Sequence, residues 1–274
     1  MSRYQHKEAK TVRDFLLAKR SPEHKRRLSC VTCYDGAFAR LIDKTDLDMV
    51  LVGDSLGNVL LGFEGTIPVT MDHMVHHTAA VSRCINRPLL CADMPFMSYH
   101  LSENQALENA ARLIQEGGAQ CVKLEGGTSI VPQVRKIVDS GIPVIGHLGL
   151  TPQSVHQMGG YRVQGRDSEA REILLREARQ LEDAGVFALV LEVIPHDLAA
   201  EVTQILKVPT IGIGAGPSCD GQILVLHDLL GFDPGFKPKF LKKYVDLGSQ
   251  IVKALESYDK EVKSGEFPTL EHSF

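Results

Sequence analysis

Short runs of apolar, β-favouring residues recur along the chain, and four of them end beside an acidic residue. A run without polar alternation is typical of a strand buried on both faces of a parallel sheet. Because the carboxyl ends of parallel strands meet on one side of an α/β fold, the four acids are candidates for a shared site. The runs and their acids are Val50–Val52 with Asp54, Leu89–Ala92 with Asp93, Cys121–Leu124 with Glu125, and Leu189–Leu191 with Glu192.

Eight such runs alternate with helical segments, and no change in composition marks a domain boundary. The order predicts an α/β fold, a (β/α)8 TIM barrel forming a single domain over residues 1–274, with a last helix at about 240–263. A doubly wound open sheet is the alternative, but the even spacing and the strand-end acids favour closure. The predicted strands cover residues 28–34, 49–54, 88–93, 119–125, 144–147, 186–194, 210–213 and 223–226.

Polar residues mark the starts of several predicted helices. Thr70, Ser102 and Ser168 each precede a helical pattern and are predicted N-caps. The segment 149–167, before the last of these helices, is rich in glycine, glutamine and serine. It is too long for an ordinary strand-to-helix connection, and loops of this kind are usually functional lids or disordered segments.

The net charge of the chain and its distribution indicate which kinds of partner to expect. The formal net charge of −4 does not support a nucleic-acid partner. Residues 1–27 hold nine Lys or Arg against three acids, which predicts a basic helical extension that closes one end of the fold. A transit peptide is the alternative. No apolar run reaches the length of a membrane span, so no membrane partner is expected.

Most of the six cysteines lie inside apolar runs, as expected of small buried side chains in a reducing compartment. We therefore expect a cytoplasmic protein. Cys30 and Cys33 have the CxxC spacing of redox and zinc sites. Both fall inside the first predicted strand rather than at a helix N-terminus, and no second CxxC follows, so simple burial is favoured.

Four carboxylates in one cavity need a counter-charge or shared protons. Asp54, Asp93 and Glu125 offer only oxygen ligands, which suits Mg²⁺ better than zinc. Lys123 lies two residues before Glu125, so both side chains point to the same face of their strand. A lysine that points into a barrel needs an anion, which indicates a carboxylate or phosphate substrate.

Glu192 has apolar neighbours on both sides, as expected of a partly desolvated carboxylate that acts as a general base. Taken one at a time, each of the four acids could instead be a helix cap or a solvated group at a strand end. Four acids at matching positions, with an inward lysine, favour a site.

Together the motifs closely resemble the ketopantoate hydroxymethyltransferase (3-methyl-2-oxobutanoate hydroxymethyltransferase) family. The resemblance covers nearly all of the chain beyond residue 28, including the tail Glu271–Phe274, and departs at Phe63–Thr66, where the family more often has His-Asp-Ser-Thr. The matching stretches are Val52–Gly57, Pro68–Thr70, His77–Val81, Ala92–Met97, Val122–Gly127, Gly146–Val155, Gly159–Gly165, Gly212–Gly216 and Asp220–Val225.

The resemblance implies a barrel of the phosphoenolpyruvate/pyruvate type and an enzyme that depends on Mg²⁺. It implies transfer of a hydroxymethyl group from the co-substrate 5,10-methylenetetrahydrofolate to 3-methyl-2-oxobutanoate, through a Mg-stabilised enolate. The product is 2-dehydropantoate, an intermediate of pantothenate biosynthesis. The family also implies a homo-oligomer, often a decamer. A Mg-dependent aldolase or lyase acting on another 2-oxo acid is the alternative.

Carried onto this chain, Asp54 and Asp93 match metal ligands at the substrate-binding site, and Glu125 matches an acid that reaches the metal directly or through water. Ser55 and Lys123 match groups that hold the carboxylate of the oxo acid. Glu192 matches the catalytic proton acceptor. His147 matches a position in the wall of the site, without an assigned step.

Overall fold

The computed structural model describes residues 9–20 and 26–274, in two compact units, Met1–Leu224 and Val225–Phe274. Each unit is described by itself. Part of the basic segment 1–27 lies outside the described residues, and a single domain over the whole chain stays a prediction.

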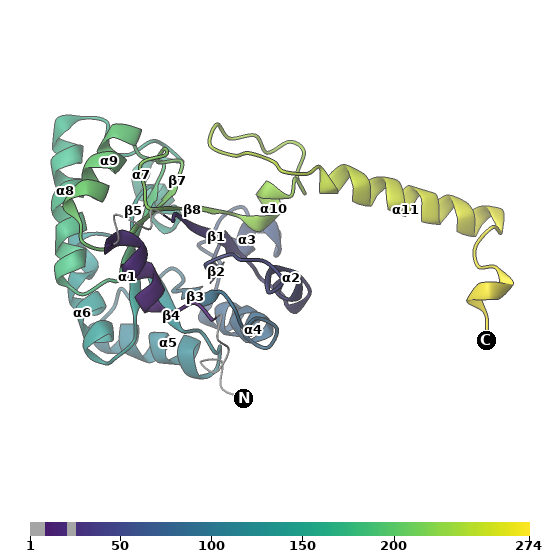
Figure 1. Ribbon diagram of the computed structural model, residues 1–274, viewed down its shortest axis with the longest axis horizontal. Helices are drawn as coiled ribbons and strands as arrows, with labels where there is room; N and C mark the ends of the chain where they lie inside the picture. The colour runs from purple at the N-terminus through teal and green to yellow at the C-terminus, as the bar shows by residue number, and fades with distance from the viewer. Residues whose placement is uncertain (1–8, 21–25) are drawn as a thin grey trace. The chain divides into compact units, whose positions relative to one another are not determined.

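The first unit is a closed barrel of eight parallel strands that pair in sequence order, with β8 returning to β1 (Figure 1). The prediction of a (β/α)8 barrel is confirmed, and the open-sheet alternative is wrong. Every residue of β2, β3 and β4 is buried, as their continuous apolar runs predicted. The strands are β1 (Leu28–Thr32), β2 (Met49–Val52), β3 (Leu89–Asp93), β4 (Cys121–Glu125), β5 (Val144–Gly149), β6 (Ala188–Glu192), β7 (Thr210–Ile213) and β8 (Gly221–Leu224).

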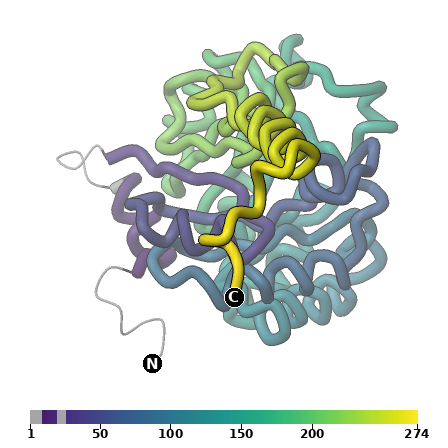
Figure 2. Tube along the Cα trace, turned by 90° about the vertical axis from the view of Figure 1, so that its right-hand side faces the viewer, coloured from purple at the N-terminus to yellow at the C-terminus, as the bar shows by residue number. Residues whose placement is uncertain are grey.

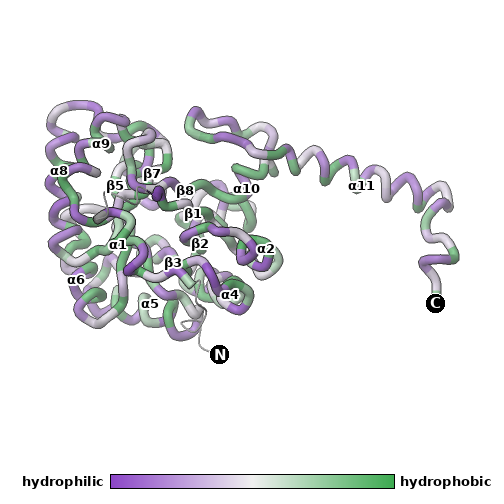
Figure 3. Tube along the Cα trace, in the orientation of Figure 1, coloured by the Kyte–Doolittle hydropathy of each residue, from purple (hydrophilic) through white to green (hydrophobic). Residues whose placement is uncertain are grey.

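Helices surround the strands, and hydrophilic and hydrophobic residues are mixed along each of them (Figure 3). In α5, for example, Ala106, Ala110 and Leu113 repeat at helical spacing and are buried. The helical segments of this unit are α1 (Val12–Arg20), α2 (Gly36–Ile42), α3 (Leu56–Val59), α4 (Met71–Ser82), α5 (Glu103–Gln115), η2 (Thr128–Ile130), α6 (Val131–Asp139), η3 (Pro152–Ser154), α7 (Val155–Met158), α8 (Ser168–Asp183) and α9 (His196–Ile205).

Two of the three predicted helix caps are confirmed. The side chains of Thr70 and Ser102 accept hydrogen bonds from backbone N–H groups in the first turns of α4 and α5. The third prediction is wrong by one residue: Asp167 caps α8, because its carboxylate accepts the N–H of Ala170 at 2.9 Å, and Ser168 is the first helical residue.

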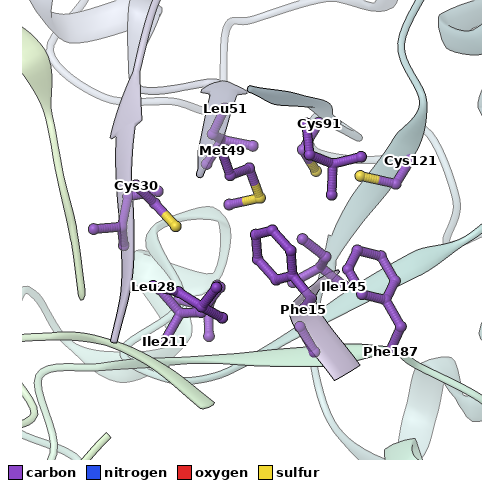
Figure 4. Close-up of a cluster of buried hydrophobic side chains, with 14 residues drawn as sticks. Phe15, Leu28, Cys30, Met49, Leu51, Cys91, Cys121, Ile145, Phe187 and Ile211 are labelled. Atoms are coloured by element: carbon purple, nitrogen blue, oxygen red, sulfur yellow. The ribbon is translucent and has the colours of Figure 1, made fainter. Parts of the chain in front are cut away.

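A cluster of buried apolar side chains fills the amino-terminal end of the barrel (Figure 4). Phe15 of α1 is fully buried in this cluster, with its ring 5.9 Å from that of Phe187 in an edge-to-face arrangement. The described part of the basic extension therefore closes the amino-terminal end of the barrel. It does not cover the carboxyl ends of the strands, where the predicted acids lie.

The two cysteines of the CxxC motif are buried thiols. Cys30 joins the cluster in Figure 4, and all six cysteines are free. Burial raises the pKa of Cys30 well above its usual value and raises the pKa of Cys33 to about 11. A redox CxxC requires the opposite shift, so the structure supports burial without redox chemistry.

The second unit contains α10 (Leu226–Leu229), α11 (Leu247–Ser264) and η4 (Leu270–His272). The helix α11, yellow in Figure 2, begins later than the predicted 240–263, because Asp246 caps it and residues 240–246 are not helical. No helix in the described part of the chain is both long and apolar enough to cross a membrane.

Candidate metal and acid–base site

Three of the four predicted acids meet at the carboxyl ends of neighbouring strands. Asp93 and Glu125 end β3 and β4, and Asp54 follows β2 by two residues. All three are buried, and one oxygen from each lies within 4.8 Å of the others. Within residues 9–20 and 26–274, this is the only group of three or more His, Cys, Asp or Glu side chains that meets this distance. Glu192, which ends β6, lies outside it.

The turn after β2 packs tightly around Asp54. A Cβ atom at Gly53 would lie 2.9 Å from Oγ of Ser55, so glycine allows the chain to fold back at this point. The half-buried Ser55 hydroxyl lies 2.8 Å from the hydroxyl of Tyr34. Its role in holding a carboxylate stays a prediction.

Lys123 points into the site, as its position in β4 predicted. Its Nζ lies 2.8 and 2.7 Å from the two carboxylate oxygens of Asp93 and 3.3 Å from Oε1 of Glu125. Burial alone would lower the pKa of Lys123, but the charges of Asp93, Glu125 and Asp54 outweigh it and raise that pKa well above its usual value. The ammonium is therefore charged and neutralises part of the acid group.

Asp54 is the least compensated of the three acids. Its Oδ2 accepts a 2.8 Å hydrogen bond from Nε2 of Gln153, a neutral group. Burial and the charges of Asp93 and Glu125 raise the pKa of Asp54 well above its usual value. A cation beside Asp54 would relieve both effects.

Gln153 and Tyr99 complete the polar network, and sequence reasoning assigned neither a role. The Gln153 backbone N–H donates to Oε2 of Glu125 at 3.1 Å, and its Nε2 also donates to the carbonyl of Met94 at 2.9 Å. The Tyr99 hydroxyl donates to Oε1 of Gln153 at 2.7 Å. The available signal for Gln153 was its position: like the acids, it lies just beyond the end of a barrel strand.

His147 of β5 lies between two acids. Its Nδ1 lies 3.2 Å from Oε1 of Glu125, and its Nε2 lies 3.3 Å from Oε2 of Glu192, a contact that falls short of hydrogen-bond geometry. Burial and Lys123 lower the pKa of His147, but Glu125 and Glu192 prevail and raise it to about 9. His147 thus links Glu192, whose side chain is 19% exposed, to the buried acids.

Replacing His147 by glutamine should change how stability depends on pH. The folded-state pKa of about 9 lies above the ordinary 6.5, so the imidazolium contributes stability that is complete below about pH 6.5 and is lost as the pH rises through about 9. Urea unfolding of the metal-free wild type and His147→Gln should show a stability difference that shrinks over this window. A difference that does not change with pH would contradict the assignment.

The peptide after Glu192 is held in a conformation that a β-branched residue rarely adopts. Val193 has a φ of 47°, in the left-handed region. Its N–H donates to the carbonyl of Ile213 at 2.8 Å, and its carbonyl accepts the N–H of Gln164 at 3.1 Å. The carbonyl of Glu192 accepts the N–H of Leu150 at 2.8 Å. Three segments of the barrel mouth therefore fix the backbone that carries Glu192.

Val193→Gly should raise the free energy of unfolding by about 1 kcal/mol, because a strained backbone of this kind costs about 1–3 kcal/mol and glycine adopts it freely. Val193→Ala is the matched control, since alanine keeps the Cβ atom and hence the strain. Urea unfolding of both variants measures the effect. If glycine destabilised the protein as much as alanine does, Val193 would carry no strain.

The acid group fits a metal ion. Its donors are all carboxylate oxygens, which are ligands for hard divalent cations. The Asp54 side has only a neutral amide partner, whereas Lys123 already contacts both oxygens of Asp93. A bound cation would therefore share the Asp93 carboxylate with Lys123. It would also neutralise the Asp54 carboxylate, which has no positively charged partner of its own.

A closed parallel barrel with polar side chains gathered at the carboxyl ends of its strands is the arrangement of a barrel enzyme, and its three buried acids could hold a metal ion. The sequence matches the family model "Ketopantoate hydroxymethyltransferase" over residues 10–270. The chain belongs to this family.

Curated relatives agree with this assignment. Proteins named 3-methyl-2-oxobutanoate hydroxymethyltransferase include one from Thermoanaerobacter sp. (strain X514), 58% identical over 91% of this chain and 91% of its own length. Another, from Moorella thermoacetica, is 57% identical over 92% of this chain and 94% of its own.

Solved structures support the fold. Phosphoenolpyruvate phosphomutase from Streptomyces platensis subsp. rosaceus has a TM-score of 0.62 at 12% identity, covering 93% of this chain and 88% of its own. A 2,3-dimethylmalate lyase of the PEP mutase/isocitrate lyase superfamily has a TM-score of 0.61 at 16% identity, covering 94% and 86%. These similarities confirm the fold, a closed (β/α)8 barrel.

Proposed function

We propose that this protein transfers a one-carbon unit from 5,10-methylenetetrahydrofolate to 3-methyl-2-oxobutanoate, giving 2-dehydropantoate for pantothenate biosynthesis. In the balanced reaction, C3 of the oxo acid loses a proton and bonds to the methylene carbon. Both bonds from that carbon to N5 and N10 of the folate break, and the carbon takes a hydroxyl group from water. The two nitrogens take up the C3 proton and the remaining proton of water, and tetrahydrofolate is released. The observation that carries this proposal is the family membership of the chain, together with the buried acid group and Lys123.

Asp54 and Asp93 would hold Mg²⁺, with Glu125 acting directly or through water. Bound there, Mg²⁺ would polarise the ketone of the oxo acid and stabilise the negative charge that develops on its oxygen. A solved relative in fold, phosphonopyruvate hydrolase, is described as a complex with oxalate and Mg²⁺; at 12% identity it shows the fold alone. The choice of Mg²⁺ here rests on the oxygen-only donors.

Lys123 and Ser55 would bind the carboxylate of the oxo acid. Lys123 is charged and buried, so an entering carboxylate would exchange one anionic partner of the ammonium for another. Ser55 lies directly after Asp54 in the sequence, and its half-buried hydroxyl lies 2.8 Å from that of Tyr34. Asp54 and Asp93 thereby belong to the substrate-binding site as well as to the metal site.

Glu192 would take the C3 proton of the oxo acid. It lies at the rim of the same end of the barrel, joined to the buried acids through His147, and it is the most exposed of the four acids. The protonated His147 would keep the Glu192 carboxylate oriented before the proton is transferred.

Purified protein tests this proposal when it is incubated with Mg²⁺, 5,10-methylenetetrahydrofolate and 3-methyl-2-oxobutanoate. We expect 2-dehydropantoate, measured by mass spectrometry, and none when a chelator removes the metal. Absence of product with active co-substrate would overturn the proposal. The alternative, a Mg-dependent aldolase or lyase, predicts instead turnover of another 2-oxo acid. Similarity to 2,3-dimethylmalate lyase at 16% identity carries the fold alone.

A homo-oligomer, decameric by family resemblance, is part of the proposal. Sedimentation velocity of the full chain would measure the assembly. A monomer at micromolar concentration would contradict it.

A further inference from the structure

A cavity of about 480 Å³ lies against the segment that follows the fifth barrel strand. Its wall is the continuous stretch Tyr161–Asp167, with Ala170 from the first turn of α8. This size lies within the range of small-molecule sites. Neither the metal nor the acid–base chemistry proposed above uses these residues.

Two contacts fix the wall beside the catalytic rim. The N–H of Gln164 donates to the carbonyl of Val193, the residue after Glu192, at 3.1 Å. Gly165 has a φ of 72°, and a Cβ atom there would lie 2.5 Å from a methyl group of Leu198. The lining segment therefore packs against α9, and it is hydrogen-bonded to Val193, the residue that follows β6 and Glu192.

Tyr161 stands between the cavity and the acids. Its hydroxyl lies 4.0 Å from the position of a Cβ atom on Gly65, in the loop that follows Asp54. Tyr161 is 60% exposed, so a ligand in the cavity can contact it. Burial of the phenol, followed by the charges of Glu192, Asp54 and Glu125, raises the pKa of Tyr161, as expected for a group near these carboxylates.

The cavity differs from the catalytic site in charge. Arg162 and Arg166 line it, and neither forms an ion pair with any residue that the structure describes. The acid on the lining, Asp167, is already engaged as the cap of α8. In contrast, the catalytic end holds four carboxylates against Lys123 and His147.

The one-carbon donor presents the matching chemistry. A reduced folate carries an aromatic ring system next to the reactive carbon and a glutamate tail with two or more carboxylates. An anionic tail is repelled by the acids and needs cations outside them. Arginine is suited to this role because its guanidinium binds a carboxylate through two parallel hydrogen bonds.

On the basis of the proposed function, we propose that this cavity binds the carboxylate tail of the reduced folate, with Arg162 and Arg166 as its cations and Tyr161 as the aromatic contact at the boundary with the catalytic site. The reactive carbon would then lie on the Tyr161 side, next to Glu192 and the oxo acid. The cavity would thus determine how long a polyglutamate tail the enzyme prefers.

Calorimetric titration with 5-formyltetrahydrofolate, a stable reduced folate, tests the proposal on the full-length protein. Ligands with one and with three glutamates are compared on the wild type, Arg162→Gln, Arg166→Gln and the double variant. We expect the triglutamate to bind the wild type more tightly. Each substitution should weaken its binding roughly tenfold, the effect of losing one charged hydrogen-bonded pair of about 1.4 kcal/mol.

Arg179→Gln is the matched control, since this exposed arginine lies on α8 beyond the cavity. It should bind both ligands as the wild type does, and all variants should melt at the wild-type temperature. Wild-type affinity in the double variant, or no preference for the triglutamate in the wild type, would overturn the assignment. Turnover and binding are measured separately, so failure to make 2-dehydropantoate would contradict the proposed function without deciding where the folate binds.

Discussion

Glu192→Gln should lower the rate of C3 proton exchange from 3-methyl-2-oxobutanoate by at least about a hundredfold, within the 10²–10⁴ range typical of general-base catalysis. Glutamine has nearly the same shape and keeps a side-chain oxygen near His147, but it cannot accept the proton. The loss should therefore appear in the rate constant of exchange, with little change in the concentration of oxo acid that half-saturates it. Proton NMR in deuterated water with saturating Mg²⁺ measures both.

The control for this variant is Glu172→Gln, which changes an exposed acid on α8 and should exchange at the wild-type rate. If Glu192→Gln also exchanged at that rate, the base would have to be another group.

Asp54→Asn should have opposite effects on the metal-free fold and on metal binding. The pKa of Asp54 is raised by burial and by the charges of Asp93 and Glu125, so the ionised form destabilises the metal-free protein. The stability that protonation provides is present at low pH and is lost as the pH rises through the raised pKa. Asparagine removes that penalty, so its stabilising effect should grow with pH.

With Mg²⁺ bound, the wild type should become more stable than Asp54→Asn. Loss of a single group that only supports a metal ligand commonly costs 10–100-fold in affinity, so loss of the Asp54 ligand should cost at least about 100-fold. Thermal melting with and without Mg²⁺ should show a large increase for the wild type and none for Asp54→Asn. Asp139→Asn, at an exposed acid that ends α6, should behave as the wild type. A variant that lost stability in the absence of metal, yet kept the Mg²⁺ shift, would contradict the role of Asp54.

The strand-end acids could be predicted because the signal is local. A buried parallel strand reads as an unbroken apolar run, and Asp93 and Glu125 lie at the ends of such runs. The inward direction of Lys123 followed from the two-residue period of a strand. Barrel closure then brought these side chains together without further information from the sequence.

Closure itself shifted one strand. The eighth strand was expected at 223–226 and lies at Gly221–Leu224, because Gly221 pairs with Leu28 where β8 meets β1. A Cβ atom at Gly221 would lie 2.7 Å from the Cβ of Leu28. Glycine is required at position 221 by a close approach to a strand nearly 200 residues earlier, which a local sequence pattern cannot reveal.

The support around the site could not be predicted for a similar reason. Gln153 and Tyr99 meet across segments that are 54 residues apart, and their roles depend on which side chains face each other after folding. The left-handed Val193 contradicts the preference of its residue type and follows from bonds to Ile213 and Gln164. Local rules fail where tertiary contacts override them, here directly beside Glu192, the proposed base.

The central claim is that the acid group and Glu192 together remove the C3 proton of a branched 2-oxo acid with the aid of Mg²⁺. Its most direct test is exchange of that proton in deuterated water by the wild-type protein, with Mg²⁺ and with a chelator. We predict exchange for 3-methyl-2-oxobutanoate that needs Mg²⁺ and is lost in both Glu192→Gln and Asp54→Asn. No exchange by the wild type, or exchange that persists with the chelator, would contradict it.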